Sequence, residues 1–219
     1  MQEKKIKYIL FDAANTLIHK PALWPRIIDV LERHRIAVNP RTLRYHHKLL
    51  SEFITFPDRT SEAFYASFNK ELLLSLGIIP TPQLLDDIFR NCTYMPWEKF
   101  EDTQWLQEAK VKIGVLSNFS NNLPDLLSGL FGDIFSDIIV SEIVSVRKPD
   151  AAFYEHAIAT IGLAPEEIVY VGDSIKLDVM PAAALGLNAT LIDRDNFYNG
   201  TDIPVIGKLS DIGDQYLIG

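Results

Sequence analysis

Residues 7–17 read KYILFDAANTL, and this stretch decides the fold. The run from Lys7 to Phe11 is apolar after its first residue and ends in Asp12. A continuous run of this length is typical of a strand that is buried on both faces of a parallel sheet. A carboxylate directly after such a strand is costly to bury without a purpose. Asp12 is therefore the first candidate functional residue.

Two further stretches repeat this pattern. Residues 112–116 read KIGVL, and Ser117 and Asn118 follow them. Residues 168–172 read IVYVG, and Asp173 follows them. Ligands of open parallel sheets bind at the carboxyl ends of the strands. We therefore expect the polar residues after the three strands to share one edge of the sheet.

Helical patterns separate the predicted strands. Residues 150–160 carry apolar side chains at helical spacing, and Gly162 follows as a stop signal. A second helix is predicted over residues 177–185, and further strands over 137–140 and 189–192. Strands that alternate with helices predict an α/β fold with helices on both faces of the sheet. The expected core is a Rossmann-like, doubly wound parallel sheet.

The segment from Pro21 to Cys92 differs, because it has no strand-like run between turns. Helix start and stop signals recur instead, and they predict four helices. The predicted helices cover residues 23–34, residues 42–53, a third segment from a Ser61 cap to Leu76, and a fourth that begins near Pro82. This segment predicts an all-helical cap domain inserted into the core, with residues 18–22 and 94–98 as hinges. The predicted boundaries give a core of residues 1–18 and 96–219 and a cap of residues 19–95.

Composition and charge indicate which classes of molecule the protein can bind. The 219 residues carry a net charge of −8, which argues against a surface built for nucleic acid or for an anionic membrane. A local cluster or a bound metal can still attract an anionic substrate. One cysteine excludes an internal disulfide, and no apolar run approaches the length of a membrane span. We expect a soluble, cytoplasmic monomer or homodimer that acts on a small molecule.

The polar residues at the predicted strand ends form an ordered set along the whole chain. Lys148 lies in RKPD just before a helix, and Asp173 and Asp178 lie in GDSIKLD. Together with the first stretch, this order resembles the four motifs of the haloacid dehalogenase-like superfamily. The residues that carry the resemblance are Asp12, Ser117, Asn118, Lys148, Asp173 and Asp178.

The resemblance implies a hydrolase with Asp12 as nucleophile and Mg²⁺ as cofactor. Asp12, Asp173 and the backbone carbonyl of Ala14 are the implied metal ligands, and carboxylates are hard oxygen ligands that suit Mg²⁺. Lys148 would supply positive charge to Asp12 and to the phosphoryl group of the substrate. Ser117 and the amide of Asn118 would donate to phosphoryl oxygens.

Asp178 is expected to play a supporting part. It would support the metal-bound waters or orient Lys148. With these roles, the predicted substrate is a small phosphorylated or otherwise anionic metabolite, hydrolysed through an aspartyl-phosphate on Asp12.

Ala14 departs from the pattern of the superfamily. Most phosphatases that the chain resembles carry a second Asp two residues after the nucleophile, which protonates the leaving alcohol and later activates water. The methyl group of Ala14 can do neither, and such acid–base help is worth about 10²–10⁴ in rate. Asn15 stands where glycine is usual, but Asn tolerates unusual backbone angles, so we expect the turn to persist.

Four explanations of Ala14 remain open from the sequence. The first is a phosphatase-type hydrolase that is slow, or that acts on substrates such as acyl phosphates, whose leaving group needs no proton. The second is an enzyme like phosphonoacetaldehyde hydrolase, a family with alanine at this position. That chemistry needs a Schiff base on a lysine of the cap, and Lys48 or Lys70 would have to supply it.

The third explanation is cleavage of a carbon–halogen bond, and the fourth is a protein that is not an enzyme. A dehalogenase also needs no acid, but true dehalogenases work without magnesium and lack the pattern that contains Asp173 and Asp178. A non-catalytic regulatory or binding protein would keep only the metal site. We expect the loop of residues 17–24 to act as a flap over Asp12, with His19, Lys20 and Trp24 as candidates for contact with substrate.

Overall fold

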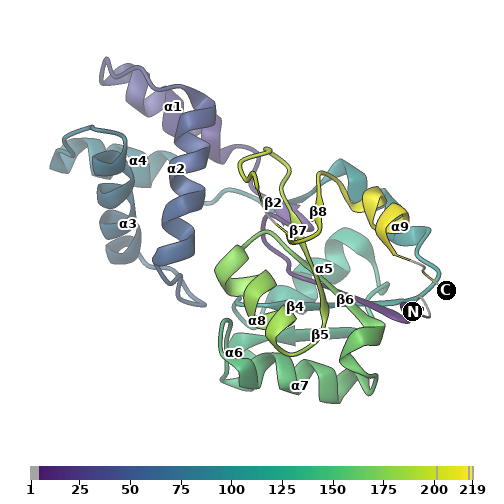
Figure 1. Ribbon diagram of the computed structural model, residues 1–219. Coiled ribbons are helices and arrows are strands. Elements are labelled where there is room, and N and C mark those ends of the chain that lie inside the picture. Colours follow the sequence, from purple (N-terminus) through teal and green to yellow (C-terminus); the bar gives the residue numbers. More distant parts are fainter. Residues whose placement is uncertain (1–4, 201, 217, 219) are drawn as a thin grey trace. The chain divides into compact units, whose positions relative to one another are not determined.

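The computed structural model describes residues 5–200, 202–216 and 218. The chain divides into two compact units (Figure 1). The first unit comprises Met1–His19 and Lys99–Gly219, and the second comprises Lys20–Glu98. The chain leaves the first unit after β2 (Ile18–His19) and returns to it within β3 (Glu98–Lys99), and these two short strands pair with each other.

The first unit is built on a parallel sheet. Among the described residues, six strands form it in the order β5-β4-β1-β6-β7-β8, and each pair of neighbouring strands is parallel. The five predicted strands are all present, and so the predicted Rossmann-like α/β fold is confirmed. The strands are β1 (Tyr8–Phe11), β4 (Lys112–Ser117), β5 (Asp137–Val140), β6 (Ile168–Gly172), β7 (Asn188–Ile192) and β8 (Val205–Ile206).

The register of the central strands brings their carboxyl ends together. Phe11, the last residue of β1, lies opposite Val115 of β4 and Val171 of β6. All four residues of β1 are buried, because strands cover both of its edges and helices of the unit pack on the sheet. The residues that follow β1, β4 and β6 therefore share one edge of the sheet.

Helices and turns connect these strands. They are η1 (Glu101–Gln107), α5 (Leu123–Phe131), α6 (Ser141–Val144), α7 (Ala151–Ile161), η2 (Pro165–Glu167), η3 (Ile175–Val179), α8 (Met180–Ala184), η4 (Leu209–Asp211) and α9 (Ile212–Gln215). The prediction of one helix over residues 177–185 was wrong in its detail, since a π-helical turn, η3, precedes a short α8. Pro181 has no N–H with which to bond the carbonyl of Leu177, and the hydroxyl of Tyr154 donates to that carbonyl instead.

The second unit is helical throughout. It consists of α1 (Leu23–Arg33), α2 (Pro40–Phe53), α3 (Glu62–Ser75) and α4 (Pro82–Asn91). Ser61 caps α3 as predicted, because its Oγ accepts from the backbone N–H of Phe64 at 3.2 Å. The core of this unit is Ile27, Val30, Leu31, Leu43, Phe68, Leu72, Leu73, Leu84 and Ile88. No helix in the described part of the chain is both long enough and apolar enough to cross a membrane.

His47 on α2 is the residue through which we expect acid to destabilise this unit. Its ring packs edge-on against Trp24 and Phe68, with ring centroids 4.9 Å apart in each pair. Burial, with a smaller contribution from the charge of Lys48, lowers the pKa of His47 to about 4. The unfolded chain therefore binds more protons between the ordinary pKa of about 6.5 and this lowered value. The free energy of unfolding that depends on neutral His47 is therefore fully present above a pH of about 6.5, and it is lost as the pH falls from there toward the lowered pKa.

We expect the variant His47→Phe to lose less stability than the wild type on acidification, because phenylalanine takes up no proton. The wild type should lose about 1–2 kcal/mol more than the variant between pH 7 and pH 5. Thermal or urea unfolding followed by circular dichroism at the two pH values measures this difference. An equal loss in both proteins would show that His47 does not carry the acid sensitivity.

Candidate active site

Asp12 lies directly after the central strand of the sheet. Its backbone N–H continues the ladder by donating to the carbonyl of Val171 at 2.8 Å, and the residue is 5% exposed. Ser117 is the last residue of the neighbouring strand β4 and is also buried. The hydroxyl of Ser117 donates to Oδ1 of Asp12 at 3.1 Å. The structure thus brings together two of the predicted site residues that are far apart in the sequence.

Lys148 reaches the same place from the loop before α7. Its ammonium is buried and donates to Oδ1 of Asp12 and to Oδ1 of Asp178, at 2.6 Å in both cases. The loop is held by Asn118, whose side-chain nitrogen donates to the Lys148 carbonyl at 2.9 Å. The side-chain oxygen of Asn118 in turn accepts from the Lys148 N–H at 2.8 Å. The side chain of Asn118 therefore anchors Lys148, and its backbone amide is the part that we expect to meet substrate.

Asp178 comes from the π-helical turn η3 and is 1% exposed. Its Oδ2 accepts from the backbone N–H of Ser174 at 2.9 Å, while Oγ of Ser174 accepts from the N–H of Leu177 at 2.9 Å. Gly172 leaves the space that Asp178 fills, since a Cβ there would lie 2.5 Å or less from the Asp178 side chain. The final glycine of β6 is therefore required by packing, and the contact with Lys148 fits the predicted orienting role of Asp178.

Three carboxylates gather at this edge of the sheet. Asp12, Asp173 and Asp178 each offer a carboxylate oxygen, and these atoms lie within 4.8 Å of one another. Hard oxygen donors in such a cluster suit a divalent cation such as Mg²⁺. The donor set therefore fits a magnesium site, and it includes Asp178, to which the sequence assigned only a supporting part.

Burial and charge act against each other within the cluster. The pKa of Asp12 is raised to about 7, because burial and, to a smaller extent, the carboxylates of Asp178 and Asp173 raise it by more than Lys148 lowers it. Burial alone would lower the pKa of Lys148, but Asp12 and Asp178 reverse this effect and hold it above its ordinary value. Lys148 is therefore a fixed positive charge beside Asp12. A bound cation would favour the ionised nucleophile still more.

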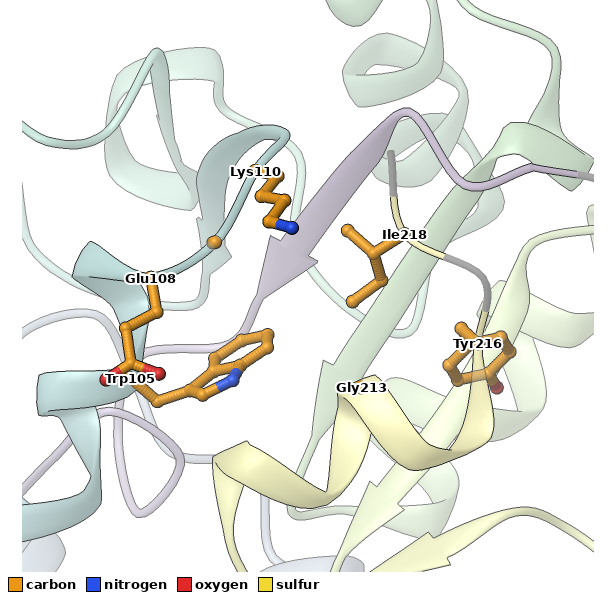
Figure 2. Close-up of a pocket in the computed structure, with 7 residues that line it drawn as sticks. Trp105, Glu108, Lys110, Gly213, Tyr216 and Ile218 are labelled. Carbon is orange, nitrogen blue, oxygen red and sulfur yellow. The ribbon is translucent and has the colours of Figure 1, made fainter.

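A hollow of about 310 Å³ lies elsewhere in the first unit. Figure 2 shows the rings of Trp105 and Tyr216 on opposite sides of it, with Ile218 beside Tyr216. None of the predicted site residues lines this hollow. The candidate chemistry of the chain therefore lies at the sheet edge and not in the hollow.

Comparison with known proteins identifies the family. The model of a family described as haloacid dehalogenase-like hydrolase matches residues 6–186. The chain belongs to this family. Haloacid dehalogenase-like hydrolase domain-containing protein 3 of Danio rerio is 33% identical over 219 aligned residues, which cover 91% of this chain and 90% of the relative.

Two further similarities extend the comparison. A glyceraldehyde 3-phosphate phosphatase of Methanothermobacter thermautotrophicus is 25% identical over 194 residues, which cover 79% of this chain and 82% of the relative. The solved structure of the HAD-hydrolase YfnB from Bacillus subtilis, bound to magnesium, has a TM-score of 0.64. It is 20% identical and covers 97% of this chain and 99% of that chain. At this identity, the structural likeness shows a shared haloacid dehalogenase-like fold.

Ala14 occupies the turn after Asp12 in this haloacid dehalogenase-like hydrolase. The turn is closed by hydrogen bonds from the N–H of Leu17 to the carbonyl of Ala13 at 2.9 Å and from the N–H of Asn15 to the carbonyl of Ile18 at 2.6 Å. Asn15 has a φ of 62°, so asparagine fills the left-handed position as expected. The turn persists without glycine, and the side chain of Ala14 has no group that can transfer a proton.

The three candidates for substrate contact all have partners within their own units. The ring of His19 stacks on Phe100, with centroids 3.9 Å apart. The ammonium of Lys20 lies 4.7 Å from the centroid of Trp97, and burial lowers its pKa. Trp24 packs on His47 in the core of the helical unit. Contact of these residues with substrate stays a prediction.

Tyr170 is a member of the site that the sequence analysis did not find. It is fully buried in β6, and its hydroxyl lies 2.9 Å from Oδ1 of Asp178 and 3.3 Å from Nζ of Lys148. In the sequence it reads as one more apolar residue of a buried strand. One observation could have indicated this role. A buried tyrosine hydroxyl needs a polar partner, and the nearest polar residues are those at the end of the same strand.

Proposed function

We propose that this protein is a Mg²⁺-dependent, phosphatase-type hydrolase that forms an aspartyl-phosphate on Asp12. The observation that carries the proposal is the buried carboxylate of Asp12, one oxygen of which is contacted by both Lys148 and Ser117. A carboxylate fixed in this way is positioned to act as a nucleophile. The relative named as a glyceraldehyde 3-phosphate phosphatase supports phosphorus as the reaction centre.

The reaction proceeds in two steps at phosphorus. An oxygen of Asp12 forms a bond to phosphorus while the bond to the leaving oxygen breaks, and the leaving group departs with the electron pair. Water then attacks the phosphorus of the aspartyl-phosphate, releasing inorganic phosphate and free Asp12. Lys148 balances the negative charge that collects between Asp12 and the phosphoryl group. The hydroxyl of Ser117 and the backbone N–H of Asn118 donate to phosphoryl oxygens.

Asp12, Asp173 and the backbone carbonyl of Ala14 would hold the Mg²⁺, with Asp178 close enough to take part. When bound, the ion supplies positive charge to the phosphoryl oxygens. Lys148 already neutralises one of the three clustered carboxylates, so a divalent cation matches the charge that remains. This balance supports magnesium as the cofactor.

Ala14 limits the substrates that this site can hydrolyse. Without a proton donor, the leaving group departs as an anion, which favours acyl or aryl phosphates over alkyl phosphates. We propose a small phosphorylated metabolite with such a leaving group. The helical unit of residues 20–98 would serve as the cap that excludes water and selects the substrate.

Phosphonate chemistry through a cap lysine is less favoured. Lys48 is paired with the buried carboxylate of Glu52 at 3.4 Å, and the two side chains are 15% and 6% exposed. A Schiff base would have to form at an amine that already contacts this carboxylate. Lys70 is exposed and lies outside the core of the helical unit.

The proposed function is tested by turnover of acetyl phosphate and p-nitrophenyl phosphate, both of which have leaving groups that need little protonation. We expect hydrolysis in Mg²⁺, its loss in excess EDTA, and its recovery when Mg²⁺ is restored, because the carboxylate cluster needs a cation to bind a phosphoryl anion. Inorganic phosphate release measures the rate. Hydrolysis that persists in EDTA would exclude the metal-dependent mechanism. Absence of hydrolysis with Mg²⁺ bound would favour a regulatory or binding role.

A further inference from the structure

Tyr170 lies on the face of β6 that meets η3. Residues two apart in a strand share one face, so Tyr170 and Gly172 face the same side of the sheet. Gly172 leaves room for the side chain of Asp178, and the hydroxyl of Tyr170 lies 2.9 Å from Oδ1 of that carboxylate. On this face of β6, Gly172 therefore leaves space for the Asp178 side chain, and Tyr170 forms a hydrogen bond with it.

The ammonium of Lys148 has three N–H donors, and a buried ammonium needs an acceptor for each of them. Oδ1 of Asp12 and Oδ1 of Asp178 provide two acceptors at 2.6 Å. The hydroxyl oxygen of Tyr170 provides a third at 3.3 Å. Because Lys148 is only 3% exposed, solvent is a poor replacement for any of them.

Besides the hydroxyl of the neighbouring Tyr154, two acceptors lie within reach of the proton of the Tyr170 hydroxyl. Oδ1 of Asp178 lies at 2.9 Å, and the backbone carbonyl of Leu116 lies at 3.4 Å. The shorter contact to a charged acceptor is the stronger one. The hydroxyl therefore accepts from Lys148 and donates to Asp178, and so it joins the two groups that face the nucleophile.

The ring of Tyr170 is itself fixed in place. Tyr154 on α7 packs edge-on against it, with centroids 5.5 Å apart. The hydroxyl of Tyr154 donates to the carbonyl of Leu177, next to Asp178 in the chain. The two tyrosines thus support η3 at adjacent points, one through the backbone and one through the carboxylate.

We propose that Tyr170 is a positioning residue, which holds the Lys148 ammonium directed at Asp12 through its hydroxyl group. The proposal rests on the proposed function for its effect on rate. Loss of the hydroxyl leaves one donor of a buried ammonium without its partner, and Lys148 is then free to turn away from Asp12. In the proposed function Ser117, the amide of Asn118 and Asp173 hold substrate and metal without Tyr170, so the larger effect falls on the chemical step at Asp12.

The variant Tyr170→Phe removes the hydroxyl and keeps the ring. We expect kcat for acetyl phosphate to fall by about 10- to 100-fold, as is typical when a supporting partner of an active-site group is lost. KM and the Mg²⁺ concentration for half-maximal rate should change much less than kcat. The matched control is Tyr8→Phe, because the buried Tyr8 also donates to a carboxylate, that of Asp137 at 2.6 Å, but it belongs to no part of the site. Its kcat should equal that of the wild type.

A second measurement does not depend on turnover. In metal-free protein labelled with ¹⁵N-lysine, the buried ammonium of Lys148 should give a slowly exchanging resonance in the wild type and in Tyr8→Phe. In Tyr170→Phe this resonance should broaden or be lost. Absence of turnover in the wild type would contradict the proposed function, while the resonance would still decide the role of Tyr170. An unchanged resonance, an unchanged kcat in Tyr170→Phe, or an equal loss in Tyr8→Phe would overturn the inference.

Discussion

Asp12→Asn should lower kcat for acetyl phosphate by on the order of 10⁴-fold or more, the scale seen when a catalytic nucleophile is removed. An amide is a poor nucleophile toward phosphorus, whereas its size and its side-chain oxygen match those of the carboxylate. The substituted residue can still accept from Lys148 and Ser117, which contact Oδ1 of Asp12 in the wild type. We therefore expect the variant to fold and to bind substrate while losing the chemical step.

The matched control for this variant is Asp137→Asn. Asp137 begins β5, and its carboxylate accepts from Tyr8 outside the candidate site. An amide oxygen can accept the same hydrogen bond, so turnover should equal that of the wild type. Phosphate release under saturating substrate and Mg²⁺ measures both variants. Turnover by Asp12→Asn close to that of the control would exclude Asp12 as the nucleophile.

Ala14→Asp should raise kcat/KM for an alkyl phosphate such as glycerol phosphate by about 10²-fold or more. A carboxylic acid at this position can protonate the departing alkoxide and then activate the attacking water. Hydrolysis of p-nitrophenyl phosphate should change much less, because its leaving group needs little protonation. The turn can accept the new side chain, since Ala14 is only half-buried and the left-handed φ lies at Asn15.

Ala14→Asn separates acid–base help from the effect of size. Asparagine has the shape of aspartate but cannot exchange a proton near neutral pH. It should therefore give no gain on the alkyl phosphate. Equal rates for the two variants would mean that the missing acid is not what limits this protein. Mg²⁺ affinity, measured by titration calorimetry, should be similar in both.

The sequence predicted the sheet well because burial on both faces leaves a clear pattern. The strand predicted over residues 168–172 has the observed bounds of β6, and the strand over residues 7–11 differs from β1 by one residue. Such runs are apolar whatever their neighbours are, so the pattern needs no knowledge of tertiary contacts. The pair Val205–Ile206 of β8 was not predicted, because two residues are too few to show a period.

The sequence predicted that the candidate residues lie close together, but it did not predict the contacts among them. Motif order pointed to Asp12, Lys148 and Asp173, and the structure places them at one edge of the sheet. The sequence could not show that the side chain of Asn118 forms hydrogen bonds with the backbone of Lys148. Nor could it show that Tyr170 turns its hydroxyl toward Asp178, because hydropathy does not report where a polar atom of a buried ring points.

The pairing of β2 with β3 has a consequence for the evolution of specificity. The helical unit is an insertion between two strands that pair with each other, and paired strands lie about 5 Å apart. An insertion with adjacent ends adds little constraint to the rest of the chain, so its length and content can vary widely. The strand that carries Asp12 keeps its place in the sheet through β4 and β6, which flank it. In the proposed function, in which the helical unit selects the substrate, a change in this insertion would alter substrate preference and leave the residues of the sheet edge in place.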